Sequence, residues 1–457
     1  METIQADLVV IGGGLAGHRC ALEAARAGAT VVLLEKMPRV GGSTVMSGGS
    51  IAFAGTDLQR SAGIEDSPER LKDDLLNVSG GYADPALIDV VASGQLAEYR
   101  FLTSRNIPFG PVQSSSGQSV PRVHSTPSSS LIDCLNTELN TLSNVSVLTD
   151  TRAMRLQQQR GRFAAVLADR KGTRIRLEAA RGIVLTTGGF SRGLDLLRKF
   201  APDASKALPA GGLGNEGDGL KLACEFGANL LDVGFVKGTF GGYFEAVPGE
   251  HYTVLLPIYR GAIAVNTKGQ RFVDESKSYK TLGAACLEQD RALAYQIFDA
   301  AIMAQSMDTT PSFNFRLAER KGRIVSADSI AQLAAALKLP PEQLQETIAQ
   351  YNADIAAGGD SRFGRSSLVH THGTPVPIAA APYYAYPTTT AINSTYAGVQ
   401  VAPDMTVINV WGERMEGLYA AGEVTGGFHG EAYMTGSSLL KALVCGAVAA
   451  RSALSGR

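Results

Sequence analysis

The sequence predicts an α/β protein in which both ends of the chain contribute to one parallel sheet and a separate α+β domain is inserted between them. Residues 7–11 are a short, continuously apolar and β-branched run, as in a buried parallel strand, and a glycine-rich turn joins them to a helical pattern. Residues 182–191 form another apolar run that ends in glycines. After about residue 236 the sequence mixes aromatic and charged residues with two helical stretches, which indicates a second domain.

These observations divide the chain into three segments. We expect the first part of the sheet domain in residues 1–236, the inserted domain in residues 237–392, and the return of the sheet domain in residues 393–457. A chain of 457 residues is long enough for two or three domains and for a large core.

The composition argues against several classes of function. The formal net charge is −1, so the charge balance points to neither a nucleic-acid partner nor an anionic membrane. The five cysteines are scattered without a C-x-x-C pair, which argues against a disulfide framework and a zinc site, and we expect no metal. Scattered cysteines fit a reducing compartment, so we expect a cytoplasmic protein.

We expect neither a signal peptide nor membrane insertion. The chain begins without a basic region or a cleavage site. No window approaches 18 uninterrupted apolar residues, so no transmembrane helix is expected. The apolar, alanine-rich residues 439–454 are expected to pack against the sheet.

A second strand at residues 30–35 completes a βαβ unit. Gly12, Gly14 and Gly17 have G-x-G-x-x-G spacing, and Glu35 lies 18 residues after Gly17. Such a turn places a pyrophosphate at the helix N-terminus, where free N–H groups and the positive end of the helix dipole bind it. Glu35 would accept hydrogen bonds from a ribose hydroxyl pair, and an acid there argues against a 2′-phosphate. The unit therefore predicts a bound dinucleotide, FAD or NAD.

Two further glycine-rich stretches are candidate ligand contacts. Residues 41–50 directly follow the ribose acid, so they form either a flexible linker or a second phosphate contact with backbone laid on a flavin ring. Residues 417–438 carry Glu423, His429 and Tyr433 at close spacing, which suits a strand end that enters a backbone-lined pocket and then a helix.

Several separated segments together resemble one family. They are the N-terminal fingerprint and residues 188–190, 217–219, 266–275 and 417–427. In order and spacing they resemble the flavoprotein core of fumarate reductases, succinate dehydrogenases and 3-ketosteroid dehydrogenases, over nearly the whole chain. The resemblance implies a Rossmann-like FAD-binding domain of the glutathione-reductase type with an inserted α+β capping domain. Covalent members attach FAD through a histidine that residues 41–50 lack, so non-covalent FAD is expected.

The resemblance also implies a set of FAD contacts along the chain. They come from the fingerprint, from the loop after Glu35, from later strand ends, and from the start of the last helix. The residues are Gly12, Gly14, Ala16, Gly17, Glu35, Lys36, Gly42, Ser43, Ser47, Gly48, Gly49, Thr187, Gly188, Asp218, Gly422, Glu423, Ser438 and Leu439.

The family reaction, as the resemblance implies it, is hydride transfer between flavin N5 and one carbon of an activated C–C bond, with proton transfer at the neighbouring carbon. Fumarate reductases use one arginine as proton donor, another as carboxylate clamp, and a histidine pair. Here the donor position is Tyr279, the clamp position is Tyr433, and residues 391–395 contain no histidine. Tyrosine cannot reproduce the bidentate geometry that a guanidinium offers to a carboxylate.

The 3-ketosteroid dehydrogenases are similar at these positions, with tyrosine at both. The resemblance implies that Tyr279 is the base that removes the α-proton. It implies that Tyr433, with N–H groups around Gly436 and Ser437, polarises a ketone oxygen. The steroid enzymes carry glycine where this chain has Ser437, which is a departure from their pattern.

Other polar residues leave alternatives open. Arg260 lies near the position of a proton-relay arginine of fumarate reductases and is an alternative donor or carboxylate anchor. Residues 103–130 are polar and predict a loop, in which Arg122 and His124 either reach the pocket or brace the loop. We expect His370 and His372 in a surface loop.

The leading hypothesis is an FAD-dependent α,β-dehydrogenase of a ketone, a cyclic one such as a 3-oxosteroid or an oxocyclohexanecarboxylate. The substrate would be a small ketone or enone, and the electron acceptor is unknown. One alternative is a fumarate reductase-like ene-reductase of an unsaturated carboxylic acid, anchored by Arg260 or Arg122. A third is an electron-transfer flavoprotein subunit.

Overall fold

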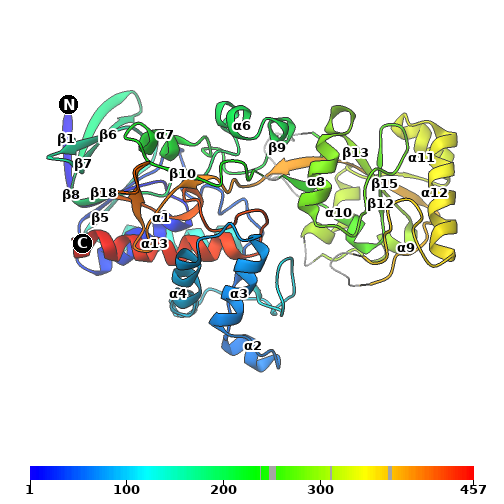
Figure 1. Cartoon of the computed structure of the whole chain (residues 1–457), viewed down its shortest axis with the longest axis horizontal. Coiled ribbons are helices and arrows are strands. Elements are labelled where there is room, and N and C mark those ends of the chain that lie inside the picture. The colour runs from blue at the N-terminus through cyan, green and yellow to red at the C-terminus, as the bar shows by residue number, and fades with distance from the viewer. Residues whose placement is uncertain (237, 246–253, 309–310, 369–372, 457) are drawn as a thin grey trace. The chain divides into compact units, whose positions relative to one another are not determined.

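The computed structural model describes residues 1–236, 238–245, 254–308, 311–368 and 373–456 (Figure 1). Residues 237, 370 and 372, which include an expected domain boundary and the two expected loop histidines, lie outside these ranges.

The chain forms two compact units. Unit 1 comprises Met1–Ala201, Gly211–Val236 and Ser394–Arg457, and unit 2 comprises Pro202–Ala210 and Lys237–Asn393. The division expected from the sequence lacks the short segment Pro202–Ala210, which joins unit 2 because its strand pairs with a strand of that unit.

Unit 1 is built on a mainly parallel sheet in the order β17-β18-β8-β1-β2-β5. Its strands β1, β2, β5, β8 and β18 run parallel, whereas β17 and the β6–β7 hairpin pair antiparallel. The carboxyl ends of β1 and β8 coincide, since Ile11 pairs with Leu185. The strands are β1 (Glu2–Ile11), β2 (Val31–Leu34), β5 (Val145–Leu148), β6 (Thr151–Gln159), β7 (Arg162–Arg170), β8 (Thr173–Leu185), β17 (Thr406–Ile408) and β18 (Arg414–Ala420).

The last helix packs into the core of unit 1, as expected. α13 (Ser437–Ser455) is long and apolar enough to cross a membrane, but most of it is buried and it lies beside α1 (Leu15–Arg26) (Figure 1). The two helices can approach closely because Gly446 has no side chain. A Cβ at this position would lie 2.6 Å from the Ala16 carbonyl oxygen.

The remaining elements of unit 1 surround this core. They are α2 (Asp57–Ser61), α3 (Pro68–Val78), α4 (Pro85–Thr103), α5 (Ser128–Thr141), α6 (Leu194–Phe200), α7 (Asp218–Cys224), η6 (Gly422–Val424), and the strand pairs β3 (Ser50–Ala52) with β4 (Val123–Ser125) and β10 (Leu230–Leu231) with β16 (Gly398–Val399).

Unit 2 is an α+β domain, as predicted. Its sheet has the order β11-β15-β13-β12, and β9 and β14 also pair with β15. Side chains alternate along β13: Ala294 and Phe298 belong to one apolar cluster, and Tyr295 and Ile297 belong to another. Helix α8 contributes Leu282 to the first cluster, and α12 contributes Leu344 to the second, so both faces of the sheet are covered.

The strands of unit 2 are β9 (Leu208–Pro209), β11 (Thr239–Tyr243), β12 (Ile263–Asn266), β13 (Ala294–Phe298), β14 (Val325–Ala327) and β15 (Tyr383–Ile392). Its helices are η1 (Asp203–Lys206), η2 (Pro257–Arg260), α8 (Tyr279–Leu287), η3 (Asp290–Ala292), α9 (Ala300–Met303), η4 (Pro311–Phe313), α10 (Phe315–Arg320), α11 (Ile330–Leu337) and α12 (Pro341–Ala356).

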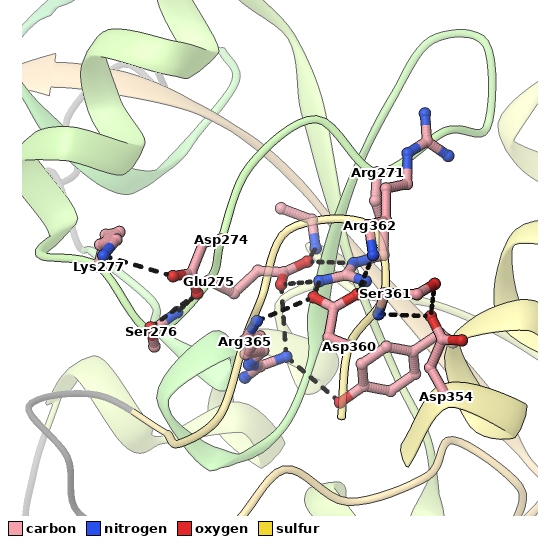
Figure 2. Close-up of polar contacts among 12 residues, drawn as sticks. Arg271, Asp274, Glu275, Ser276, Lys277, Asp354, Asp360, Ser361, Arg362 and Arg365 are labelled. Carbon is pink, nitrogen blue, oxygen red and sulfur yellow. Dashed lines mark hydrogen bonds and ion pairs between the residues drawn. The ribbon is translucent and has the colours of Figure 1, made fainter. Parts of the chain in front are cut away.

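A buried ion group lies inside unit 2 (Figure 2). The Arg271 guanidinium donates to both carboxylate oxygens of Glu275, at 2.9 and 2.6 Å, and to both oxygens of Asp360, at 2.9 and 2.8 Å. Burial would raise the pKa of Asp360, but the Arg271 side chain and the backbone N–H groups of Arg365 and Arg362 lower it to about 2. One arginine therefore binds both carboxyl groups in the interior.

Replacing Arg271 by methionine should destabilise unit 2. The substitution leaves two buried carboxylates without their guanidinium, and removing one partner of a buried ion pair costs about 3–5 kcal/mol. Chemical denaturation, followed by the fluorescence of tyrosines in unit 2, measures the free energy of unfolding. The exposed Arg362→Met is the control and should change that free energy by less than about 0.5 kcal/mol. A similar small loss in both variants would contradict the assigned role of Arg271.

Candidate active site

The glycines of the first turn serve two purposes. A Cβ on Gly12, whose φ is +115°, would lie 2.4 Å from the Thr186 carbonyl oxygen, and one on Gly17 would lie 2.0 Å from the Gly12 carbonyl oxygen. These two glycines therefore allow β1, α1 and β8 to pack closely. A Cβ on Gly14 would meet only the Thr44 hydroxyl, at 3.9 Å. The backbone at Gly14 thus faces space that a ligand could approach.

The N-terminus of α1 is suited to an anion. Gly14 is the N-cap, no side chain caps it, and the first turn contains no acidic residue. Leu15 N–H donates to the Thr44 hydroxyl at 3.2 Å. The first N–H groups of a helix lack partners within the helix, and with the positive end of the dipole they favour a diphosphate at this position.

Glu35 holds the turn and keeps capacity for a further donor. Its carboxylate accepts from Gly13 N–H at 3.0 Å and from Met37 N–H at 2.8 Å. Burial raises the pKa of Glu35, and these N–H groups oppose the shift. An ionised carboxylate has about four acceptor positions, so it can also take ribose hydroxyls.

Two other expected cofactor contacts are paired with each other. Lys36 Nζ lies 2.8 Å from both Asp218 Oδ2 and Glu216 Oε2. Arg152 Nη2 also donates to Asp218, at 2.7 Å. Burial would raise the pKa of Asp218, but Lys36 and Arg152 lower it. Lys36, which directly follows Glu35 in the chain, and Asp218 therefore belong to a group of four charged side chains, with Glu216 and Arg152.

Glu423 lies at the centre of a network that the sequence did not reveal. Its carboxylate accepts from Asn215 Nδ2 and from Thr395 N–H, both at 2.9 Å. Asn215 Nδ2 also donates to the Ser43 hydroxyl at 3.0 Å. Burial raises the pKa of Glu423, and the Thr395 and Asn215 donors lower it. Asn215 thus joins two expected FAD contacts, Ser43 and Glu423, that are distant in the sequence.

The loop after Glu35 is held at one side and open at the other. A Cβ on Gly49 would lie 1.7 Å from the Thr126 carbonyl oxygen, so Gly49 packs against the neighbouring backbone. The Ser47 hydroxyl donates to the Thr44 carbonyl at 2.7 Å. A Cβ on Gly48 would meet no atom within 4 Å, and one on Gly42 would meet only Gly14, at 3.7 Å. Gly42, Gly48 and Gly14 therefore leave the backbone accessible.

Strand ends supply further contacts. The Thr187 hydroxyl is buried and has no hydrogen-bond partner among the described residues, so it can serve a bound group. Gly188, with φ +74°, follows it. A Cβ on Gly422 would lie 2.9 Å from the Ala16 methyl group. Gly422 and Ala16 therefore allow the N-terminal and C-terminal segments of unit 1 to pack closely.

Gly436 and Ser437 form the start of α13. Gly436 is the N-cap with φ +91°, and Ser438 and Leu439 lie in the first turn of the helix. Ser437 directs both its N–H and its hydroxyl to the Met434 carbonyl, at 3.2 and 2.7 Å. Ser437, an expected ketone-binding donor, is therefore occupied within its own turn.

Tyr433 belongs to an aromatic cluster with Tyr396 and His429. The Tyr396 and Tyr433 rings are nearly parallel, with an interplanar angle of 11° and centroids 6.1 Å apart. The His429 ring lies 5.5 Å from Tyr433 and 5.3 Å from Tyr396. Tyr396 is buried, whereas Tyr433 is partly exposed. Tyr433, which stands at the position of the clamp arginine, is thus packed against two other rings.

In unit 2, Tyr259 bonds to the backbone of Tyr279 and directly precedes Arg260 in the sequence. Tyr279 is the first residue of α8, and its N–H donates to the Tyr259 hydroxyl at 3.0 Å. Burial raises the pKa of Tyr259. The partly buried Arg260 guanidinium lies over the Phe313 ring, 4.5 Å from its centroid, and 3.3 Å from Met307 Sδ. No carboxylate of the described residues lies within ion-pair distance of Arg260, and its Nε is buried without a partner.

Arg122 and His124 brace the loop. Arg122 is fully buried and pairs with Asp66 at 2.8 Å and with Asp74 at 2.5 Å. His124 contacts the Thr56 hydroxyl and the Arg122 carbonyl, each at 2.9 Å. The alternative in which Arg122 anchors a substrate carboxylate is therefore wrong, because two acids already occupy its guanidinium.

A family model described as FAD binding domain matches residues 7–439. The chain belongs to the FAD-binding flavoproteins of the fumarate reductase and succinate dehydrogenase family. It is 29% identical to a fumarate reductase (cytochrome) of Shewanella frigidimarina, over 98% of the chain and 76% of that protein. It is 28% identical to a urocanate reductase of Eggerthella lenta, over 99% of the chain and 75% of that protein.

Two solved structures resemble this flavoprotein in fold. The open conformation of a flavocytochrome c3 fumarate reductase is 25% identical, with a TM-score of 0.88, and the match covers 99% of this chain and 78% of that one. A 3-ketosteroid-Δ4-(5α)-dehydrogenase from Rhodococcus jostii RHA1, in complex with 4-androstene-3,17-dione, is 26% identical with a TM-score of 0.76, over 98% and 97%.

The comparisons confirm the predicted fold, the cofactor FAD and the general chemistry. The flavoprotein is an FAD-dependent oxidoreductase of CH–CH bonds. The residues of unit 1 fit the cofactor, because Gly14 and Gly48 leave space beside the backbone and the buried Thr187 hydroxyl lacks a partner among the described residues.

Replacing Gly14 by alanine should weaken FAD binding without destabilising the apoprotein. The added methyl group meets no protein atom closer than 3.9 Å, but it fills space beside the helix N-terminus that the pyrophosphate requires. We expect the Kd for FAD to rise by at least about tenfold, or roughly 1.4 kcal/mol. Titration of the apoprotein with FAD measures it, and Gly359→Ala in unit 2, where the methyl group also meets nothing, is the control. Unchanged affinity in the Gly14 variant would contradict this assignment.

Proposed function

We propose that this flavoprotein reduces the C=C bond of an α,β-unsaturated carboxylic acid and holds FAD without a covalent bond. Two observations support the choice of substrate. The most similar curated proteins reported above are reductases named for fumarate and urocanate, both unsaturated acids. In unit 2, Arg260 offers a guanidinium that no acid of the described residues neutralises.

The environment of Arg260 is the observation that carries the proposal. Arg260 is partly buried, its Nε is enclosed, and no carboxylate of the described residues pairs with it. Buried charges in proteins are normally paired, so the acid group of a ligand is a suitable partner. Phe313 covers one face of the group, Nε is buried, and Nη2 lies 3.3 Å from Met307 Sδ, so the outer N–H groups of the two Nη atoms are the donors proposed for a ligand. A planar fork of donors matches a carboxylate bidentately, so Arg260 is suited to anchor the acid group of the substrate.

Tyr279 is the proposed proton donor for the carbon next to the acid group. A phenol is protonated at neutral pH, and the α8 N-terminus and Tyr259 fix the backbone from which it extends. FAD, when bound and reduced by a two-electron donor, would supply the hydride. The reduction is complete when the other carbon has received the hydride and Tyr279 has been reprotonated from solvent.

A substrate with a single carboxylate fits the residues better than a diacid. Tyr433 stands where the fumarate reductases have their clamp arginine, and a tyrosine offers one hydroxyl in place of a charged fork. Of the three clustered rings, Tyr396 and His429 are buried and Tyr433 is partly exposed, so the Tyr433 ring is the part that could pack against a ring or a chain of carbon atoms. The non-covalent attachment of FAD is proposed because residues 41–50 contain no histidine.

Desaturation of a cyclic ketone is a second candidate, and the two tyrosines favour it. Tyr279 and Tyr433 occupy both positions that the resemblance to 3-ketosteroid dehydrogenases assigns to ketone chemistry. A solved ketosteroid dehydrogenase is also 26% identical over nearly its whole length. In this candidate Tyr279 removes the α-proton and Tyr433 donates to the ketone oxygen. Anaerobic bleaching of the bound flavin by a saturated cyclic ketone would favour it over the reductase.

Replacing Arg260 by glutamine tests the anchor. Hydrogen bonds to a charged group contribute about 1.5–3 kcal/mol, so the KM for an unsaturated monocarboxylic acid should rise about ten- to a hundredfold. The KM for the amide of the same acid should stay within about twofold, because the amide carries no charge. Steady-state reduction of both compounds by a reduced viologen dye measures the two constants.

The matched control for this test is Arg316→Gln, an exposed arginine of α10. It should leave both KM values unchanged. An equal rise for the acid and the amide in the Arg260 variant, or no rise for either, would show that Arg260 does not bind the carboxylate.

A further inference from the structure

Arg365 is a buried arginine whose hydrogen bonds surround the turn that carries Arg260. Its side chain is fully buried in unit 2, in the segment that follows α12 (Figure 2). Nη2 donates to the Ile258 carbonyl at 3.2 Å, and Nη1 donates to the Ala262 carbonyl at 3.0 Å. These two carbonyls lie on either side of Arg260 in the sequence. One guanidinium therefore fixes both ends of the short segment from which Arg260 extends.

Arg365 adds to other contacts of the same turn. Ala262 N–H donates to the Pro257 carbonyl and Ile258 N–H donates to Gln296 Oε1, both at 3.2 Å. Residues Pro257–Arg260 form the 3-10 helix η2, which ends at Gly261 with φ +119°. Gly261 N–H makes only a long bond, 3.4 Å, to the Ile258 carbonyl. A Cβ on Gly261 would lie 2.5 Å from Val376 Cγ2, so close packing also holds the backbone here, and polar contacts with neighbouring segments add to it. Arg365 supplies two of those contacts with a rigid, planar group.

The buried ion group holds Arg365 in turn. Arg365 N–H donates to Asp360 Oδ2 at 3.2 Å, and Arg365 Nη1 lies 3.6 Å from Glu275 Oε2. Asp360 and Glu275 are the two acids that Arg271 binds (Figure 2). Two arginines and two carboxylates thus balance each other in the interior. Glu275 lies four residues before Tyr279, so the same group also fixes the segment that leads to the proposed proton donor.

We propose that Arg365 is a positioning residue for substrate binding, which acts by orienting Arg260. This inference rests on the proposed function, because it assumes that Arg260 binds the carboxylate of the substrate. Arg365 itself does not contact the substrate. Its role is to hold the Ile258 and Ala262 carbonyls so that the Arg260 guanidinium is directed at one point. A displacement of about 1 Å at such an anchor can change a rate or a binding constant by up to about a hundredfold.

The test compares Arg365→Lys with the neighbouring control Arg362→Lys. Lysine keeps the charge that Glu275 requires, but its single ammonium cannot reproduce the fork that reaches both carbonyls. We expect Arg365→Lys to retain FAD and to raise the KM for the unsaturated monocarboxylic acid about tenfold, with the KM for its amide within about twofold. The exposed Arg362→Lys should leave both values unchanged.

A double variant separates positioning from a general loss of structure. If Arg365 acts through Arg260, Arg365→Lys should have almost no further effect on the KM for the acid in the Arg260→Gln background, since effects of coupled residues are not additive. Full additivity, or an equal rise in KM for the acid and the amide, would overturn the inference. A wild-type protein that reduces neither compound would instead defeat the proposed function, and this inference with it.

A second variant covers the case in which Arg365→Lys does not fold. Arg365→Met combined with Glu275→Gln removes one charge of each sign and leaves no uncompensated charge in the interior. Glutamine keeps an acceptor for Ala264 N–H, which donates to Glu275 at 3.1 Å. This variant should show the same selective rise in KM for the acid. Retained FAD with an unchanged KM for the acid would overturn the assignment of Arg365.

Discussion

The buried pairing of Arg271 with Glu275 and Asp360 is the interaction on which the interior of unit 2 depends, and with it the position of the proposed anchor Arg260. It joins the segment between β12 and α8, which carries Arg271 and Glu275, to the segment after α12, and Arg271 and Asp360 are 89 residues apart. Arg365 extends the same group to the turn that carries Arg260. Because these charges are buried, the group tolerates little displacement, and the residues that extend from it inherit fixed positions.

In the FAD-binding unit the corresponding constraint is close backbone packing. Gly12 and Gly17 have no room for a Cβ, so β1, α1 and β8 meet at one point, and the start of α1 is fixed relative to the ends of both strands. Gly14 then offers open backbone at that point. The network of Ser43, Asn215 and Glu423 joins three separate loops around the same region. The expected cofactor contacts of unit 1 and the proposed substrate anchor of unit 2 therefore rely on different physical interactions.

The sequence was informative where local chemistry decides the structure. The strand, turn and helix around Gly12–Gly17 and the acid at Glu35 follow from local spacing, and the inserted α+β domain follows from the change in composition after about residue 236. Long-range pairing was not predictable. Around Arg122, the sequence of residues 103–130 predicts only a polar loop. Nothing in it indicates that Asp66 and Asp74 occupy the Arg122 guanidinium. Asn215 and Arg365 were missed for the same reason. Asn215 donates to Glu423, 208 residues away, and the two carbonyls that Arg365 binds are 103 and 107 residues away.

The most direct test of this account is rapid mixing of the chemically reduced wild-type protein with an unsaturated monocarboxylic acid, in the absence of oxygen. The return of the oxidised flavin spectrum reports transfer of electrons to the C=C bond. The account predicts reoxidation that saturates with the acid concentration and does not occur with the saturated acid. A reduced flavin that unsaturated acids leave unchanged, together with an oxidised flavin that a saturated cyclic ketone bleaches, would contradict it.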